Sequence, residues 1–125
     1  MNRIAIVAIL LCSALFTNCQ SQVSPTITRI DKSYLKENVV NKDVQLVDVR
    51  TAEEYAAGHI GHAVNFNIVQ GDVFLEQIQS LDKDKPVYLY CKAGGRSNRA
   101  AQLLKEKGFV KIYDYSGGYN DWVTE

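Results

Sequence analysis

Residues 87–97 of the chain read Val87-Tyr88-Leu89-Tyr90-Cys91-Lys92-Ala93-Gly94-Gly95-Arg96-Ser97. After Pro86, the β-branched, aromatic and aliphatic residues are typical of a buried parallel strand. The two glycines can take positive φ, and a helix is predicted from Ser97, its N-terminal cap, to about Lys107. Because ligands bind at the carboxyl edge of open parallel sheets, this pattern places Cys91 at a binding edge.

The loop after this strand predicts a reactive cysteine. The backbone N–H groups of Lys92, Ala93, Gly94, Gly95, Arg96 and Ser97 can turn inward as an anion-binding nest. The helix N-terminus and the Lys92 and Arg96 side chains add positive charge, so Cys91 is predicted to be a thiolate at neutral pH. The alternative is a small buried cysteine that only fills the core. Cys-x-x-Gly-x-Arg at a strand-to-helix turn favours the reactive cysteine.

Strands and helices alternate along the rest of the chain, which predicts an α/β fold. Strands are predicted at 27–30, 44–49, 63–66 and 110–113. Helices are predicted from a cap at Asp31 or Ser33 to Glu37, from the capping box Thr51-Ala52-Glu53-Glu54 to a left-handed Gly58, and over 72–81. With 125 residues there is room for one domain, a parallel sheet flanked by helices on both faces.

Three segments, in this order, resemble signatures of the rhodanese-like sulfurtransferases. The first is Val47-Asp48-Val49-Arg50-Thr51-Ala52-Glu53-Glu54-Tyr55 with Gly58-His59-Ile60-Gly61-His62-Ala63, the second is the loop after Cys91, and the third is Gly117-Gly118-Tyr119-Asn120-Asp121-Trp122. The resemblance implies that Cys91 carries sulfur as a persulfide held by the loop amides, without a metal or organic cofactor. The implied donor is a small sulfur-containing anion such as thiosulfate, and the acceptor a thiol, cyanide or a protein.

Asp48 and Arg50 are predicted to lie at the same sheet edge as Cys91. Opposite charges at such an edge commonly pair with each other or with the backbone, so a structural role is favoured. The resemblance agrees on a supporting role for Asp48, and Arg50 is a candidate contact for an anionic substrate. His59 and His62 are weaker candidates for a general base, and two histidines without a nearby cysteine cluster do not predict a metal site.

Two other functions use similar residues. Tyrosine-phosphatase-like phosphatases and arsenate reductases resemble Cys-x5-Arg, usually with histidine before the cysteine, whereas this chain has Cys91-x4-Arg96 after Tyr90. The shorter loop favours a single sulfur over a tetrahedral anion. A non-catalytic rhodanese-like binding module is the third interpretation, but such modules commonly lack the cysteine. The charges balance at 14 basic and 14 acidic residues, and no nucleic-acid partner is predicted.

The N-terminus predicts export. A positive start, Met1-Asn2-Arg3, precedes an apolar run over 4–16 that is too short to span a bilayer comfortably and fits a signal peptide. Leu15-Phe16-Thr17-Asn18-Cys19 resembles a bacterial lipobox, although Phe16 and Asn18 depart from the usual pattern. Expected are a signal at 1–18, a tether at 19–27 from an acylated Cys19, and the domain at 28–125, anchored to a membrane of the cell envelope. The alternatives are an exported soluble form, if Cys19 is not acylated, and an N-terminal helix that is either buried or kept as a membrane anchor.

Overall fold

The computed structural model describes residues 23–125, so the predicted signal peptide, Cys19 and most of the tether lie outside the described residues. Within them, five strands form one parallel sheet in the order β1-β5-β4-β2-β3. The strands are β1 (Thr26–Ile30), β2 (Gln45–Asp48), β3 (Val64–Asn65), β4 (Val87–Tyr90) and β5 (Lys111–Tyr115). The predicted parallel α/β sheet is confirmed.

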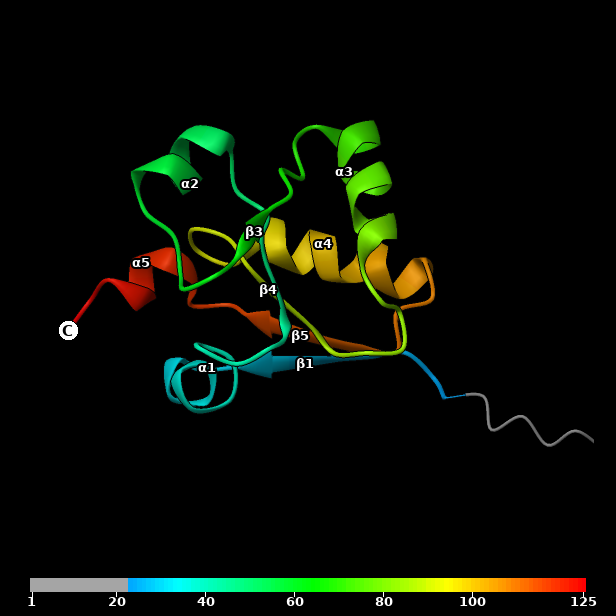
Figure 1. The fold of residues 1–125 in the computed structure, drawn as a ribbon, viewed down its shortest axis with the longest axis horizontal. Helices are drawn as coiled ribbons and strands as arrows, with labels where there is room; N and C mark the ends of the chain where they lie inside the picture. Colours follow the sequence, from blue (N-terminus) through cyan, green and yellow to red (C-terminus); the bar gives the residue numbers. More distant parts are fainter. Residues whose placement is uncertain (1–22) are drawn as a thin grey trace, which may run out of the picture.

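Helices cover both faces of this sheet, as predicted. They are α1 (Lys32–Asn38), α2 (Ala52–Ala57), α3 (Gly71–Gln77) with a 3-10 turn η1 (Ile78–Ser80), α4 (Gly95–Glu106) and α5 (Gly118–Trp122). Figure 1 shows α3 and α4 on one side of the sheet and α1 on the other, with α5 beyond the tips of the strand arrows. No helix among residues 23–125 combines the length and apolar character that a bilayer crossing requires.

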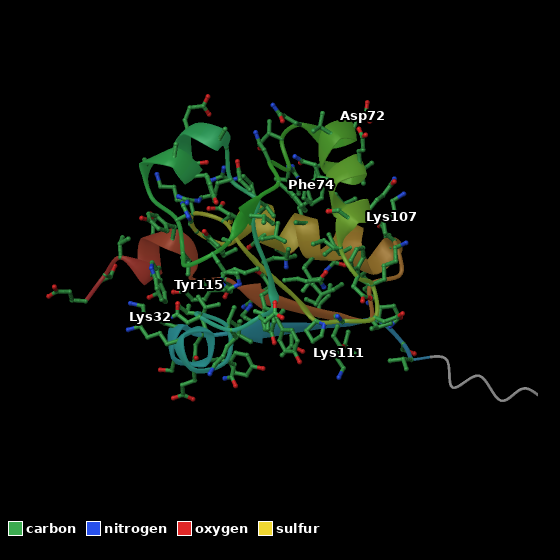
Figure 2. The ribbon with its side chains drawn as sticks, viewed as in Figure 1. Lys32, Asp72, Phe74, Lys107, Lys111 and Tyr115 are labelled. Carbon is green, nitrogen blue, oxygen red and sulfur yellow. The ribbon has the colours of Figure 1, made fainter. Side chains whose placement is uncertain are left out.

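The central strand β4 divides the core into two layers. Val87, Leu89 and Cys91 join a cluster with residues of α3 and α4, such as the fully buried Phe74. Figure 2 shows Phe74 directed toward the interior, while Asp72 of the same helix lies at its outer end. Tyr88 and Tyr90 point the other way, into a cluster with residues of α1 and the segment after α2. Burial on both faces explains why β4 is apolar throughout.

The strand register brings the predicted site residues to one edge. Tyr90 pairs with Asp48 on β2 and with Tyr115 on β5. All strands are parallel, so β2 and β4 end at the same edge, and Arg50 and Cys91 follow them there. The turn that leads from β5 into α5 lies at this edge as well. The sequence signatures, far apart along the chain, therefore meet there.

Most of the predicted helix caps and ends agree with the structure. The Asp31 side chain accepts a hydrogen bond from the Tyr34 N–H at 2.8 Å, so Asp31 rather than Ser33 caps α1. Thr51 and Glu54 form the predicted capping box. The helix predicted over 72–81 gives way to the 3-10 turn at Ile78.

Two boundaries differ from the prediction. Gly58 has φ 155° and ψ 144°, which is not the left-handed helical conformation but another one that residues with a side chain rarely adopt, and a Cβ there would overlap the Tyr119 hydroxyl. The sheet begins at Thr26, inside the segment assigned to the tether, because the Thr26 N–H donates to the Val110 carbonyl at 3.0 Å. A contact with a distant element decided the geometry in both places.

Candidate active site

Cys91 lies immediately after β4 and is only 1% exposed. Its Sγ accepts a hydrogen bond from the Gly94 N–H at 3.0 Å and lies 3.5 Å from the Ser97 Oγ. It is the free cysteine of the described residues. The loop thus folds back over the sulfur, which places it at the first turn of α4.

The loop favours the ionised sulfur. Burial alone raises the pKa of the Cys91 thiol, but hydrogen bonds from the Ser97 hydroxyl and from the N–H groups of Ser97, Gly94 and Ala93 outweigh it. The net result is a pKa below the ordinary value for cysteine. The predicted thiolate therefore has a physical cause in the loop amides, as the sequence suggested, and in one buried hydroxyl.

Gly94, rather than Ser97, turns the chain into α4. Gly94 is the N-cap, with φ 103°, and a Cβ there would lie 2.6 Å from the Ser116 carbonyl oxygen. A left-handed glycine starts the helix three residues before the predicted cap, so Ser97 falls inside the first turn. The Ser97 side chain is fully buried, and its hydroxyl donates to the Gly94 carbonyl at 3.2 Å. The prediction that Ser97 caps the helix is therefore wrong, and its hydroxyl contacts the Cys91 sulfur instead.

The C-terminal segment forms backbone hydrogen bonds to the loop that contains Cys91. The N–H of Tyr119 donates to the Cys91 carbonyl at 2.8 Å, and the N–H of Asn120 donates to the Lys92 carbonyl at 3.0 Å. These bonds fix two loop carbonyls away from the sulfur, which leaves the following amides free to face it. The residues after Gly117 and Gly118, in the third signature segment, therefore support the cysteine loop.

Arg96 is paired with a carboxylate. Its guanidinium donates to both carboxyl oxygens of Glu54, at 2.7 and 2.9 Å. This pairing is the main cause that lowers the pKa of Glu54 to about 2; burial opposes it, and hydrogen bonds from Thr51 assist it. Arg96 therefore links the loop to α2. Lys92 is exposed and forms no ion pair within residues 23–125.

Arg50 and Asp48 form the pair that was favoured from the sequence. Asp48 is fully buried, Arg50 is 3% exposed, and the Arg50 Nη2 lies 2.7 Å from the Asp48 Oδ2. Arg50 also donates to the Gly58 carbonyl at 2.7 Å and lies over the Tyr119 ring, 4.2 Å from its centroid. The pair thus connects β2, the end of α2 and α5 behind the cysteine loop.

The two histidines lie away from the sulfur's contacts. His59 stacks on Tyr55, and the His62 Nε2 lies 3.2 Å from the Val44 carbonyl. In the part of the chain that the structure describes, no three His, Cys, Asp or Glu side chains gather as a metal site would need.

The site and fold agree with comparisons to known proteins. The family of the Rhodanese-like domain matches residues 31–125, and the chain belongs to this family. It is 41% identical over 81 residues to the uncharacterized protein YqhL of Bacillus subtilis, an alignment that covers 65% of this chain and 62% of YqhL, less than two thirds of that relative. It is 35% identical over 86 residues to the thiosulfate sulfurtransferase GlpE of Coxiella burnetii, covering 69% of this chain and 78% of GlpE.

A solved structure extends this similarity to three dimensions. The crystal structure of a rhodanese-like domain protein from Staphylococcus aureus has a TM-score of 0.68 and 31% sequence identity, and the match covers 78% of this chain and 93% of that chain. A sulfurtransferase is therefore among the relatives, and the fold is that of the family.

Proposed function

We propose that the protein is a sulfurtransferase that moves sulfane sulfur from a donor such as thiosulfate, through a persulfide on Cys91, to a thiophilic acceptor. The Cys91 thiolate attacks the outer sulfur of thiosulfate; a sulfur–sulfur bond forms to Cys91, and the bond to the sulfonate breaks as sulfite leaves with its electron pair. A thiolate or cyanide then takes the outer sulfur and returns Cys91 to the thiolate.

The observation that carries this proposal is the cradle around Sγ. Backbone amides and the Ser97 hydroxyl lower the pKa of Cys91 against the effect of burial, with no general base among the groups responsible. In this proposal the same amides hold the negative outer sulfur of the persulfide, as an oxyanion hole holds oxygen. Lys92, exposed beside the cysteine, is the candidate cation for attracting an anionic donor, whereas Arg96 and Arg50 are engaged with carboxylates.

The proposal is tested by the mass of the purified protein after treatment with thiosulfate. We expect the protein to gain one sulfur atom, and cyanide to remove it as thiocyanate. Aryl phosphates and arsenate serve as competing substrates in parallel assays. Phosphate hydrolysis or arsenate reduction that is faster than sulfur uptake from every donor tested would contradict the sulfurtransferase proposal. It would favour a phosphatase or an arsenate reductase instead.

We further propose that the protein is exported and anchored through a lipid on Cys19. The support is the sequence alone: a positive start, an apolar run too short to span a bilayer, and a cysteine directly after it. Several acyl chains on one terminus would suffice for stable anchoring.

Cys19→Ala is expected to release the protein from the membrane fraction without changing sulfur uptake, because residue 19 precedes β1 and the domain. Fractionation of cells and the mass of the mature N-terminus provide the measurement. Cys12→Ala is the matched control and should leave membrane partitioning intact. Membrane partitioning that survives Cys19→Ala would argue for a retained N-terminal helix instead.

A further inference from the structure

The carboxylate of Glu54 contacts the cysteine loop and is held from two sides. Its Oε2 accepts from the Thr51 N–H at 3.0 Å and lies 3.1 Å from the Thr51 hydroxyl. Arg96 donates to both carboxyl oxygens, at 2.7 and 2.9 Å. The hydrogen bond from Arg96 is the main cause that lowers the pKa of Glu54 to about 2, so this fixed carboxylate is charged at neutral pH.

Arg96 belongs to the part of the loop that surrounds the sulfur. It follows Gly94, whose N–H donates to the Cys91 Sγ at 3.0 Å, and it precedes Ser97, whose Oγ lies 3.5 Å from the same atom. A guanidinium presents a planar fork of N–H groups that suits the paired oxygens of a sulfonate or a carboxylate. In Arg96 this fork is already filled, because its Nη1 and Nη2 both donate to Glu54.

The other two cations near the site differ in their partners. Arg50 is 2.7 Å from the buried Asp48, whereas Lys92 is exposed and forms no ion pair within residues 23–125. Of these three cations, Lys92 alone keeps its charge uncompensated by a carboxylate. Thiosulfate carries two negative charges and must approach a sulfur that is itself an anion, so its repulsion from the thiolate is larger than that of a singly charged donor.

We propose that Glu54 is a specificity-determining residue that engages the guanidinium of Arg96 and so makes the site favour a singly charged sulfur donor, the persulfide of a small uncharged thiol, over thiosulfate. The inference rests on the proposed sulfurtransferase for its substrate. In this reaction the Cys91 thiolate attacks the outer sulfur of the donor persulfide. A sulfur–sulfur bond forms to Cys91, and the donor's own sulfur–sulfur bond breaks as its thiolate leaves with the electron pair.

The first test compares two alkylating reagents, the anion iodoacetate and the neutral iodoacetamide, by the mass of the Cys91 peptide from the full chain. Both react with the same thiolate, so the ratio of their rates reports how the site receives an anion, whatever the pKa of the thiol. Glu54→Gln should raise the iodoacetate-to-iodoacetamide ratio about threefold, the order expected for a pair of partly exposed charges. Glutamine also serves in a capping box, so α2 keeps its cap.

Glu53→Gln is the matched control, because Glu53 is exposed in the same turn of α2 and forms no ion pair within residues 23–125. It should change the ratio much less. Arg96→Gln should lower the ratio more in the Glu54→Gln background than alone, because only there is the guanidinium free to meet an anion. An unchanged ratio in Glu54→Gln, an equal rise in Glu53→Gln, or equal effects of Arg96→Gln in both backgrounds would overturn the proposal.

The second test measures sulfur uptake by mass. The wild type should gain sulfur faster from the persulfide of 2-mercaptoethanol than from an equal concentration of thiosulfate. Glu54→Gln should accelerate uptake from thiosulfate about threefold more than uptake from the persulfide. Equal acceleration with both donors, or a wild type that takes sulfur faster from thiosulfate, would overturn the preference. Uptake from neither donor would contradict the sulfurtransferase itself, and the alkylation ratio would still decide whether Glu54 restrains Arg96.

Discussion

Replacing Cys91 with serine is expected to abolish sulfur uptake from thiosulfate completely. An alcohol at this position has no thiolate to attack the donor and cannot carry a persulfide under these conditions. Serine still offers an acceptor to the Gly94 N–H, which in the wild type lies 3.0 Å from the sulfur, so the loop should keep its shape. Mass measurement after thiosulfate treatment and thiocyanate formation with cyanide give two independent readouts.

The control for this loss is the integrity of the fold. Circular dichroism and thermal unfolding of Cys91→Ser should resemble the wild type, with a change of about 1 to 2 kcal/mol for placing a hydroxyl in a buried sulfur site. Because the chain's other cysteines are Cys12 and Cys19, a variant that lacks both but retains Cys91 should transfer sulfur normally. Transfer that persists in a folded Cys91→Ser protein would locate the chemistry at another residue.

The position of Cys91 could be predicted because it depends on local patterns. The β-branched, aromatic and aliphatic residues after Pro86 favour a strand that is buried on both faces, and β4 is buried at each of its residues. Gly94 and Gly95 follow Cys91 within four residues, which predicts a turn at the carboxyl edge. The capping box of Thr51 and Glu54 is likewise a short-range device, and α2 begins where it predicts.

The contacts around the loop could not be predicted, because they join residues far apart in the sequence. Glu54 was identified only as a capping residue, yet its carboxylate also pairs with Arg96, 42 residues further along. The Glu54 Oε2 accepts from the Thr51 N–H and from Arg96 at the same time, and the Glu54 Oε1 accepts from Arg96 as well. The capping bond therefore leaves both carboxyl oxygens available to Arg96. Nothing in the local pattern of either residue indicates this shared use.

The start of α4 illustrates a competition between two local signals. Serine is a good N-cap, and this preference placed the helix start at Ser97. The close approach of Ser116 to Gly94 requires a residue without a side chain, and a glycine at φ 103° turns the chain three residues earlier. The tertiary contact decided the boundary, and it freed the Ser97 hydroxyl to face the sulfur instead of capping the helix.

Helix α5 was not predicted, and the reason lies in its length and composition. It has five residues, begins at a glycine with φ 67°, and offers too little periodicity to indicate a helix. Its stability comes from its surroundings: the Tyr119 and Asn120 N–H groups bond to the cysteine loop, and Tyr119 packs on Arg50. The loop and α5 thus stabilise each other, which a local pattern cannot reveal.

Gly118→Ala is therefore expected to damage both stability and activity. A Cβ at Gly118 would lie 2.5 Å from the Lys92 carbonyl oxygen and 2.6 Å from the Cys91 carbonyl oxygen, and both are backbone atoms that cannot move without moving the loop. We expect a loss of about 1 to 2 kcal/mol for a side chain at positive φ, and about 1 to 3 kcal/mol more for the overlap. Because the loop amides hold the sulfur, displacing them by about 1 Å should slow sulfur uptake by about a hundredfold.

Gly108→Ala is the matched control, because Gly108 also has positive φ, at 90°, but a Cβ there would meet nothing within 4 Å. Chemical denaturation of both variants separates the backbone cost, which they share, from the overlap with the loop, which belongs to Gly118 alone. Sulfur uptake should be unchanged in Gly108→Ala under conditions where that variant is folded. If Gly118→Ala loses no more stability than Gly108→Ala and retains full uptake, α5 does not brace the cysteine loop, and the amides must be held inward by α4 and the Arg96–Glu54 pair alone.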